Sequence, residues 1–139
     1  MTLRDRKILT FDVIGTLIDF EAGILNYIRP LAAEAGLKLG DADILATFAR
    51  LEDQQHSSTP RASFTTMLDP IYEAMAAELG LPATAQHVEG LRLSIPKWPA
   101  FPDSIDAMKR LGKRFRLVAT TNADNWAVAC FARTLDDPF

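Results

Sequence analysis

The residues with the clearest chemical potential stand directly after the first apolar segment. Asp12 lies in the run Phe-Asp-Val-Ile-Gly-Thr-Leu, residues 11–17, three positions before Gly15. A carboxylate at the carboxyl end of a parallel strand lies where open α/β sheets bind ligands, and it can attack an electrophile to form a covalent ester. Gly15 permits a tight turn there. Asp-x-x-Gly is also common in ordinary turns, so these residues alone leave both interpretations open.

A second polar pair follows a second apolar run near the end of the chain. Thr121 and Asn122 come directly after residues 115–119, Phe-Arg-Leu-Val-Ala. A hydroxyl and an amide at the carboxyl end of a strand can hold an anionic oxygen of a substrate. Both residue types also cap helices frequently, so capping of the last helix is the alternative role. Two such loops from neighbouring strands form a pocket more readily than one loop does.

The spacing of apolar residues predicts an α/β fold with a parallel sheet. Residues 7–11 and 115–119 are short apolar runs of the kind that form buried strands. Residues 96–102 contain three prolines and predict an extended connector. Amphipathic helices are predicted on either side of the second strand, the first of them starting at Asp103. A strand, a crossover helix and a second strand in this order favour parallel pairing.

Four further helices are predicted between about residues 20 and 93, separate from the sheet layer. Their expected positions are a helix from Phe20 to a stop at Gly36, one capped by Asp41 or Asp43, one from Phe64 to a stop at Gly80, and one from Thr84 to Leu93. Pro30 and Pro70 are expected to kink or split the first and third helices. The chain thus divides into a sheet-bearing core, residues 1–18 and 97–139, and a helical insert, residues 19–96.

Composition and charge narrow the class of protein. The chain has 139 residues, a net charge of -3 and one cysteine, Cys130. The charge argues against nucleic acid and anionic membranes as partners, because no basic face is available to neutralise phosphates. No apolar run approaches a membrane span, and no signal peptide is recognisable. An intrachain disulfide is impossible with one cysteine, which fits a cytoplasmic location.

Several residues are given structural roles. His56 and His87 lack neighbours at ligand spacing, so no metal site is predicted. Trp98 and Trp126 are expected to be packing residues. Asp19 and Asp124 are expected to serve in turns or helix caps.

Taken together, these motifs resemble the haloacid dehalogenase (HAD) superfamily of hydrolases. The resemblance rests on Asp-x-x-Gly-Thr-Leu after an apolar strand, a helical insert, and a later strand followed by Thr-Asn. It implies a Rossmann-like core and a mobile helical cap that closes over the active site. By this resemblance, Asp12 matches the nucleophile, while Thr121 and Asn122 match the substrate-binding motif. Arg50 is a loose match for the cap arginine of dehalogenases and is a candidate to grip the substrate, but a solvated surface role is favoured for it, because arginines on helices are mostly exposed.

Position 14 bears on the reaction. Phosphatases of the superfamily place a second aspartate two residues after the nucleophile, where it protonates the leaving group, but this chain has Ile14. General acid help is typically worth about 10²- to 10⁴-fold, whereas halide leaves unprotonated. Dehalogenases also lack this aspartate, although many carry tyrosine there. The resemblance therefore favours metal-free dehalogenation of a small anionic 2-haloacid. The alternative is a Mg²⁺-dependent phosphatase or phosphonatase.

The remaining family motifs have no match in this sequence. The resemblance implies a later lysine that offsets the charge of the nucleophile, followed by acidic residues. We expect the chain to be a truncated product or a fragment with an incomplete core. Two strands leave sheet edges exposed, which favours self-association into a homo-oligomer. A catalytically inactive interaction module is therefore a further alternative.

Overall fold

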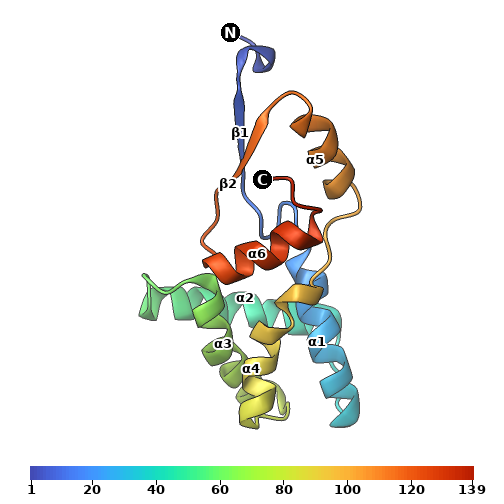
Figure 1. The fold of residues 1–139 in the computed structure, drawn as a ribbon. Helices are drawn as coiled ribbons and strands as arrows, with labels where there is room; N and C mark the ends of the chain where they lie inside the picture. Colours follow the sequence, from blue (N-terminus) through green and yellow to red (C-terminus); the bar gives the residue numbers. More distant parts are fainter.

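A computed structural model describes residues 1–139. It contains a two-stranded parallel sheet, with helices between the two strands along the chain and one helix after the second strand. Figure 1 shows the sheet with α5 and α6 at one end of the molecule and α1 to α4 at the other. The elements in chain order are η1 (Leu3–Asp5), β1 (Ile8–Phe11), α1 (Phe20–Glu34), α2 (Asp41–Ser58), α3 (Phe64–Leu79), α4 (Ala85–Leu93), η2 (Ile95–Lys97), α5 (Ser104–Gly112), β2 (Arg116–Ala119) and α6 (Asn125–Thr134). No helix is both long and apolar enough to cross a bilayer.

The sheet consists of β1 and β2 in parallel register. Ile8 pairs with Arg116, and Phe11 pairs with Ala119. One residue further on, the amide of Thr120 donates to the carbonyl oxygen of Phe11 at 2.7 Å. The predicted strands, their parallel pairing and the α/β class with a helical insert are confirmed. The carboxyl ends of both strands therefore meet at the same edge.

The burial of β1 differs from the prediction of a buried strand. Ile8 is 53% exposed and Thr10 is also exposed, whereas Leu9 and Phe11 are half-buried against the core. Because successive side chains of a strand point to opposite faces, one face of β1 is covered and the other meets solvent.

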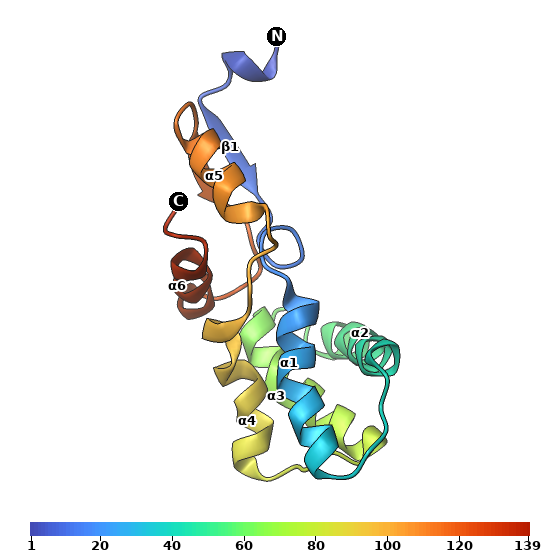
Figure 2. The ribbon, with the colours of Figure 1, turned by 90° about the vertical axis from the view of Figure 1, so that its right-hand side faces the viewer.

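The helical insert is built from α1 to α4. Neighbouring helices pack together, α2 and α4 on α3, and α1 on α2 and α4, as Figure 2 shows from the side. Their apolar stripes meet in a core that includes the buried side chains Ile24, Ile28, Phe48, Leu68 and Tyr72. The four predicted helices are confirmed, with left-handed glycines after α1 (Gly36, φ +70°) and at the end of α3 (Gly80, φ +80°).

Pro30 and Pro70 do not split their helices, which was one of the two predicted effects. Pro30 lies inside α1 and Pro70 inside α3, and both helices continue without a break. Each proline removes one hydrogen bond to the carbonyl four residues earlier. Those carbonyls belong to Asn26 and Thr66, which are exposed residues where water can replace the lost donor.

The start of α2 and the proline-rich connector also differ in detail from the predictions. The cap residue of α2 is Gly40, and Asp41 and Asp43 lie in its first turn, where carboxylates favour the positive end of the helix dipole. Pro96 and Lys97 belong to the short helix η2 rather than to an extended segment. The fixed φ of proline suits the first residues of such a turn.

The two segments that join the sheet to the helical insert run side by side. Ile18 forms an antiparallel bridge with Ala100. The amide of Asp19 donates to the carbonyl of Pro99 at 2.9 Å, and the amide of Phe101 donates to that of Leu17 at 3.0 Å. The division of the chain into a core and a helical insert at residues 18/19 and 96/97 remains a prediction. The paired segments 17–19 and 99–101 lie next to these predicted boundaries.

Trp98 anchors the junction between the helical insert and the core. Its ring is wholly buried and lies 5.9 Å from the ring of Phe64 and 6.3 Å from that of Phe131, centroid to centroid. Its indole N–H donates to the hydroxyl of Ser94 at 2.9 Å. The predicted packing role of Trp98 is confirmed. That of Trp126 is wrong, because this side chain is 42% exposed on α6.

Candidate functional site

Asp12 follows β1 directly and lies exposed at the carboxyl edge of the sheet. The loop after it is fixed by its backbone: the amide of Leu17 donates to the carbonyl of Val13 at 2.9 Å, and the amide of Gly15 donates to that of Ile18 at 2.9 Å. Val13 is buried and holds the loop against the core. A short, internally bonded loop thus presents the carboxylate to solvent.

Gly15 is required by the shape of this loop. Its φ is +84°, in the left-handed region that side chains other than glycine rarely occupy. A Cβ atom at this position would also lie 3.2 Å from the ring of Phe20. Both observations explain why glycine follows Asp12 at this spacing.

Thr16 orients the carboxylate of Asp12. Its hydroxyl donates to Asp12 Oδ2 at 2.7 Å, while Oδ1 accepts no hydrogen bond from the protein. One oxygen is therefore held and the other is left open to an electrophile. The sequence analysis did not single out Thr16, although it lies within the same Asp-x-x-Gly-Thr motif.

Thr121 and Asn122 lie on the loop after β2, at the same sheet edge as Asp12. Thr121 is half-buried, and its hydroxyl oxygen accepts from the amide of Ala123 at 3.2 Å. Asn122 is exposed, and its carbonyl accepts from the amide of Phe64 at 3.2 Å, which ties this loop to the start of α3. The parallel register thus brings the two predicted polar loops to one edge of the sheet.

Neither Thr121 nor Asn122 caps the last helix. The cap of α6 is Asp124, whose Oδ1 accepts from the amide of Ala127 at 2.9 Å. Asp19 has the same role in α1, where its Oδ1 accepts from the amide of Ala22 at 3.0 Å. The predicted capping roles of both aspartates are confirmed. The hydroxyl O–H of Thr121 and the side-chain N–H groups of Asn122 donate no hydrogen bond within the protein, so they can donate to another partner.

Ile14 lies in the loop after Asp12 and is half-buried. It forms a backbone bridge with Ile18, and its side chain packs against the hydrophobic core. No proton donor is available from this side chain.

Arg50 is not brought to Asp12. It lies exposed on α2, and its guanidinium pairs with Glu78 near the end of α3. Phe64, at the other end of α3, contacts the Asn122 loop, and at 1.5 Å per residue Glu78 lies about 21 Å along the helix from it. The structure therefore supports the surface role favoured for Arg50.

No group of three or more histidine, cysteine, aspartate or glutamate side chains in this chain is arranged to hold a metal ion. The arrangement at the sheet edge is instead one oriented, exposed carboxylate beside a loop that carries a hydroxyl and an amide. Such a set can attack an electrophilic centre and hold an anionic oxygen.

Solved structures with the same fold are numerous, although neither a protein-family model nor a curated protein matches the sequence. An L-2-haloacid dehalogenase matches with a TM-score of 0.74 and 23% identity, over 93% of this chain and 57% of that chain. The L-2-haloacid dehalogenase from Xanthobacter autotrophicus matches with a TM-score of 0.73 and 14% identity, over 94% of this chain and 52% of that one.

The likeness extends to a structure with a bound metal ion. The HAD-hydrolase YfnB from Bacillus subtilis, solved bound to magnesium, matches with a TM-score of 0.71 and 18% identity, over 94% of this chain and 60% of that one. The chain thus spans somewhat more than half the length of these proteins. Over nearly all of its own length, it has the fold of the haloacid dehalogenase-like hydrolases.

Proposed function

We propose that this chain belongs to a HAD-like hydrolase that removes halide from a small 2-haloacid, with Asp12 as the nucleophile. The observation that carries the proposal is the exposed carboxylate of Asp12, oriented by the 2.7 Å hydrogen bond from Thr16 at the carboxyl edge of the sheet. Because the chain spans part of the length of its structural relatives, the proposal concerns the activity of the whole protein.

The reaction has two steps. Asp12 Oδ1 attacks the carbon that bears the halogen, the carbon–halogen bond breaks, and halide leaves with the bonding electron pair. Water then attacks the carbonyl carbon of the resulting ester, which releases a 2-hydroxy acid and a proton and restores Asp12. Thr121 and Asn122 hold the substrate carboxylate through their free donors.

The isoleucine at position 14 favours a reaction whose leaving group needs no proton. An isoleucine cannot transfer a proton, and a phosphate monoester would lose the general acid help worth about 10²- to 10⁴-fold. Halide leaves as an anion, so it loses nothing at this position.

A structural relative supports the covalent intermediate. One structure of the Xanthobacter autotrophicus enzyme holds chloropropionic acid covalently bound, and it matches this chain with a TM-score of 0.67 and 16% identity. In our proposal, the atom that forms the corresponding bond here is a carboxylate oxygen of Asp12.

A magnesium-dependent phosphatase or phosphonatase is the second candidate. It is favoured by the magnesium in the YfnB structure. Asp12 is the residue of this chain that would ligate the ion. Magnesium commonly keeps several waters and binds through one or two carboxylates, and Asp12 would supply one of them. Bound there, the ion would neutralise charge on a phosphoryl oxygen of the substrate.

The test is halide release from 2-chloropropionate by the whole protein that carries these residues, with and without EDTA. Asp12→Asn removes the nucleophile, and Asp106→Asn, at an exposed carboxylate of α5, is the matched control. Halide release that is lost in the first variant, kept in the second and unchanged by EDTA is the expected result.

Other outcomes favour the alternatives. Phosphate release from p-nitrophenyl phosphate that requires Mg²⁺ and Asp12 would replace dehalogenation by the phosphatase. A whole protein that is folded by circular dichroism yet releases neither product would overturn both enzymatic candidates and favour the non-catalytic interaction module.

A further inference from the structure

A cavity of about 260 Å³ lies between α1, α4 and η2. Its walls include Gly23, Asn26 and Tyr27 of α1, and Gly90 and Leu93 of α4. A cavity of about 150 Å³ is enough to hold benzene. The space between α1 and α4 therefore has room for an organic molecule somewhat larger than benzene.

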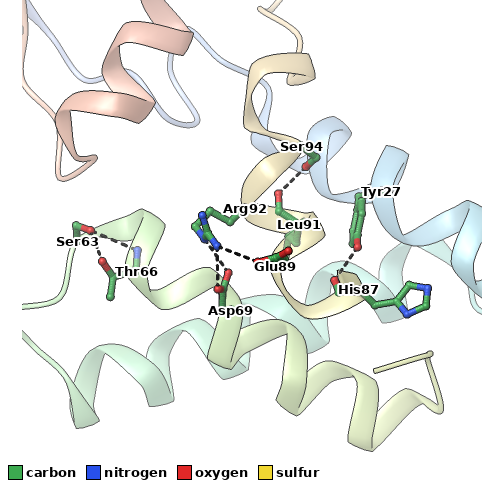
Figure 3. Close-up of polar contacts among 9 residues, drawn as sticks. All are labelled: Tyr27, Ser63, Thr66, Asp69, His87, Glu89, Leu91, Arg92 and Ser94. Atoms are coloured by element: carbon green, nitrogen blue, oxygen red, sulfur yellow. Dashed lines mark hydrogen bonds and ion pairs between the residues drawn. The ribbon is translucent and has the colours of Figure 1, made fainter. Parts of the chain in front are cut away.

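Two aromatic side chains hold the walls of this cavity in place. Tyr27 Oη donates to the carbonyl oxygen of His87 at 2.6 Å and so ties α1 to α4, as Figure 3 shows. A Cβ atom at Gly90 would overlap the same hydroxyl, so glycine is required beside it. The indole N–H of Trp98, another residue of the wall, donates to Ser94 Oγ at 2.9 Å. Because these contacts exist without a ligand, binding requires little ordering of the walls.

Lys97 and Asn26 are the polar side chains of the wall that have no partner within the protein. Lys97, in η2, takes part in no ion pair. The side-chain amide of Asn26 takes part in no hydrogen bond. Ser94 Oγ, in contrast, donates to the carbonyl oxygen of Leu91 at 2.6 Å and accepts from Trp98. No aspartate or glutamate lines the cavity, so its one charge is positive and lacks a counter-ion.

Leu93 gives the cavity an apolar wall that meets solvent. Its side chain is 51% exposed, whereas most large hydrophobic side chains of the helical insert are buried. An alkyl chain that covers Leu93 removes apolar surface of both partners from water. Each methylene group buried in this way is worth about a fourfold gain in affinity.

From these features, we propose that the cavity binds a short-chain aliphatic monocarboxylate. The carboxylate pairs with the ammonium group of Lys97 and accepts from the side-chain amide of Asn26, while the alkyl chain lies against Leu93. A cationic ligand would meet the charge of Lys97 with no carboxylate to offset it, and is disfavoured. No residue of the wall belongs to the loops after β1 and β2, so the site stands independently of the dehalogenase proposal.

Trp98 gives a local reporter of binding, because it lines the cavity. The whole protein that carries these residues is labelled with 5-fluorotryptophan and observed by ¹⁹F NMR, and the Trp98 signal is the one lost in Trp98→Phe. The probe is sodium pentanoate at constant ionic strength, with 1-pentanol and pentylammonium chloride as matched probes. We expect a saturable shift of the Trp98 signal with pentanoate alone, while the signal of Trp126, on α6, stays in place. Isothermal titration calorimetry gives the affinity independently of the label.

Exposed side chains test the named contacts without disturbing the core. Lys97→Met keeps the apolar stem and removes the charge, so we expect up to about fivefold weaker binding of pentanoate, whereas Lys97→Arg retains it. Lys113→Met, at an exposed lysine that follows α5, is the matched control and leaves binding unchanged. In the parent protein, affinity should rise about fourfold per methylene group from propionate to pentanoate.

Four results would overturn the proposal. Equal binding of 1-pentanol would show that the carboxylate is not recognised, and preferential binding of pentylammonium would reverse the assigned charge. Lys97→Met that binds pentanoate as tightly as Lys113→Met does would remove the ion pair. A Trp98 signal that pentanoate does not shift would show that the cavity takes no such ligand.

Discussion

The close approach of α1 to Trp98 depends on the absence of a side chain at Gly23. A Cβ atom built at Gly23 lies 2.4 Å from Cγ of Trp98 and 2.6 Å from Cδ1 and Cδ2. The indole cannot retreat, because it is wholly buried between Phe64 and Phe131 and its N–H is bonded to Ser94. Gly23→Ala must therefore shift either α1 or the indole ring of Trp98.

The magnitude follows from two opposing contributions. Overpacking of a filled core costs about 1–3 kcal/mol, and a rigid aromatic neighbour places this site at the upper end. Alanine in place of a helical glycine returns about 1 kcal/mol. We expect Gly23→Ala to lower the free energy of unfolding by about 2 kcal/mol. At roughly 4 °C per kcal/mol for a chain of this size, the melting temperature falls by roughly 8 °C.

Gly112→Ala is the matched control, because it is also a helical glycine. A Cβ atom at Gly112 meets only Leu117 Cδ1, at the ordinary contact distance of 3.7 Å. This variant should gain up to about 1 kcal/mol from helix propensity. Urea unfolding followed by circular dichroism at 222 nm measures both variants against the parent chain.

The reasoning fails if Gly23→Ala stabilises the chain as Gly112→Ala does, because helix propensity would then decide both sites. Trp98→Phe provides a second check. The smaller ring makes room for the added methyl group, so Gly23→Ala should cost less in the Trp98→Phe background than alone. Purely additive costs would show that the two residues do not press on each other.

Three further predictions concern stability. Burial raises the pKa of Tyr72 to about 12, and Tyr27 adds to the shift. An unfolded tyrosine ionises near pH 10, so the unfolded state loses this proton first and the chain loses stability as the pH rises from about 10 to 12. The urea midpoint should therefore fall over this range, and it should fall less in Tyr72→Phe. Asp19→Ala should cost about 1 kcal/mol by removing the α1 cap, and Asp19→Asn should cost little, in the same unfolding assay. Arg50→Ala should cost less than about 1 kcal/mol, because its pair with Glu78 is exposed; a larger loss of thermal stability would contradict this.

The backbone was predictable from sequence because local periodicity determines it. The apolar spacing located both strands and all four helices of the insert, and Asp19 and Asp124 were recognised as caps. Parallel pairing then follows from the order of elements, and with it the shared edge of the Asp12 and Thr121 loops. These features depend on residues close in sequence or on a strong topological preference.

Features that depend on contacts between distant side chains were not predicted. The partner of Arg50 is Glu78, on another helix, and no local pattern signals that pair. The exposure of Trp126 and of one face of β1 depends on what covers them, which composition does not reveal. The hydrogen bond from Thr16 to Asp12 depends on the turn at Gly15, whose geometry the motif suggests but does not specify.

The pairing of Ile8 with Arg116 also constrains the order of folding. Roughly 100 residues separate the two strands, and closing a flexible loop of that length costs about 4 kcal/mol of chain entropy. Once the helices have formed and Ile18 has met Ala100, the open chain between the strands shortens to roughly 25 residues, and the cost falls to about 3 kcal/mol. Helix contacts are local and form early. We therefore expect the parallel sheet, with the edge that carries Asp12, to be completed after the helices that the chain crosses between its two strands.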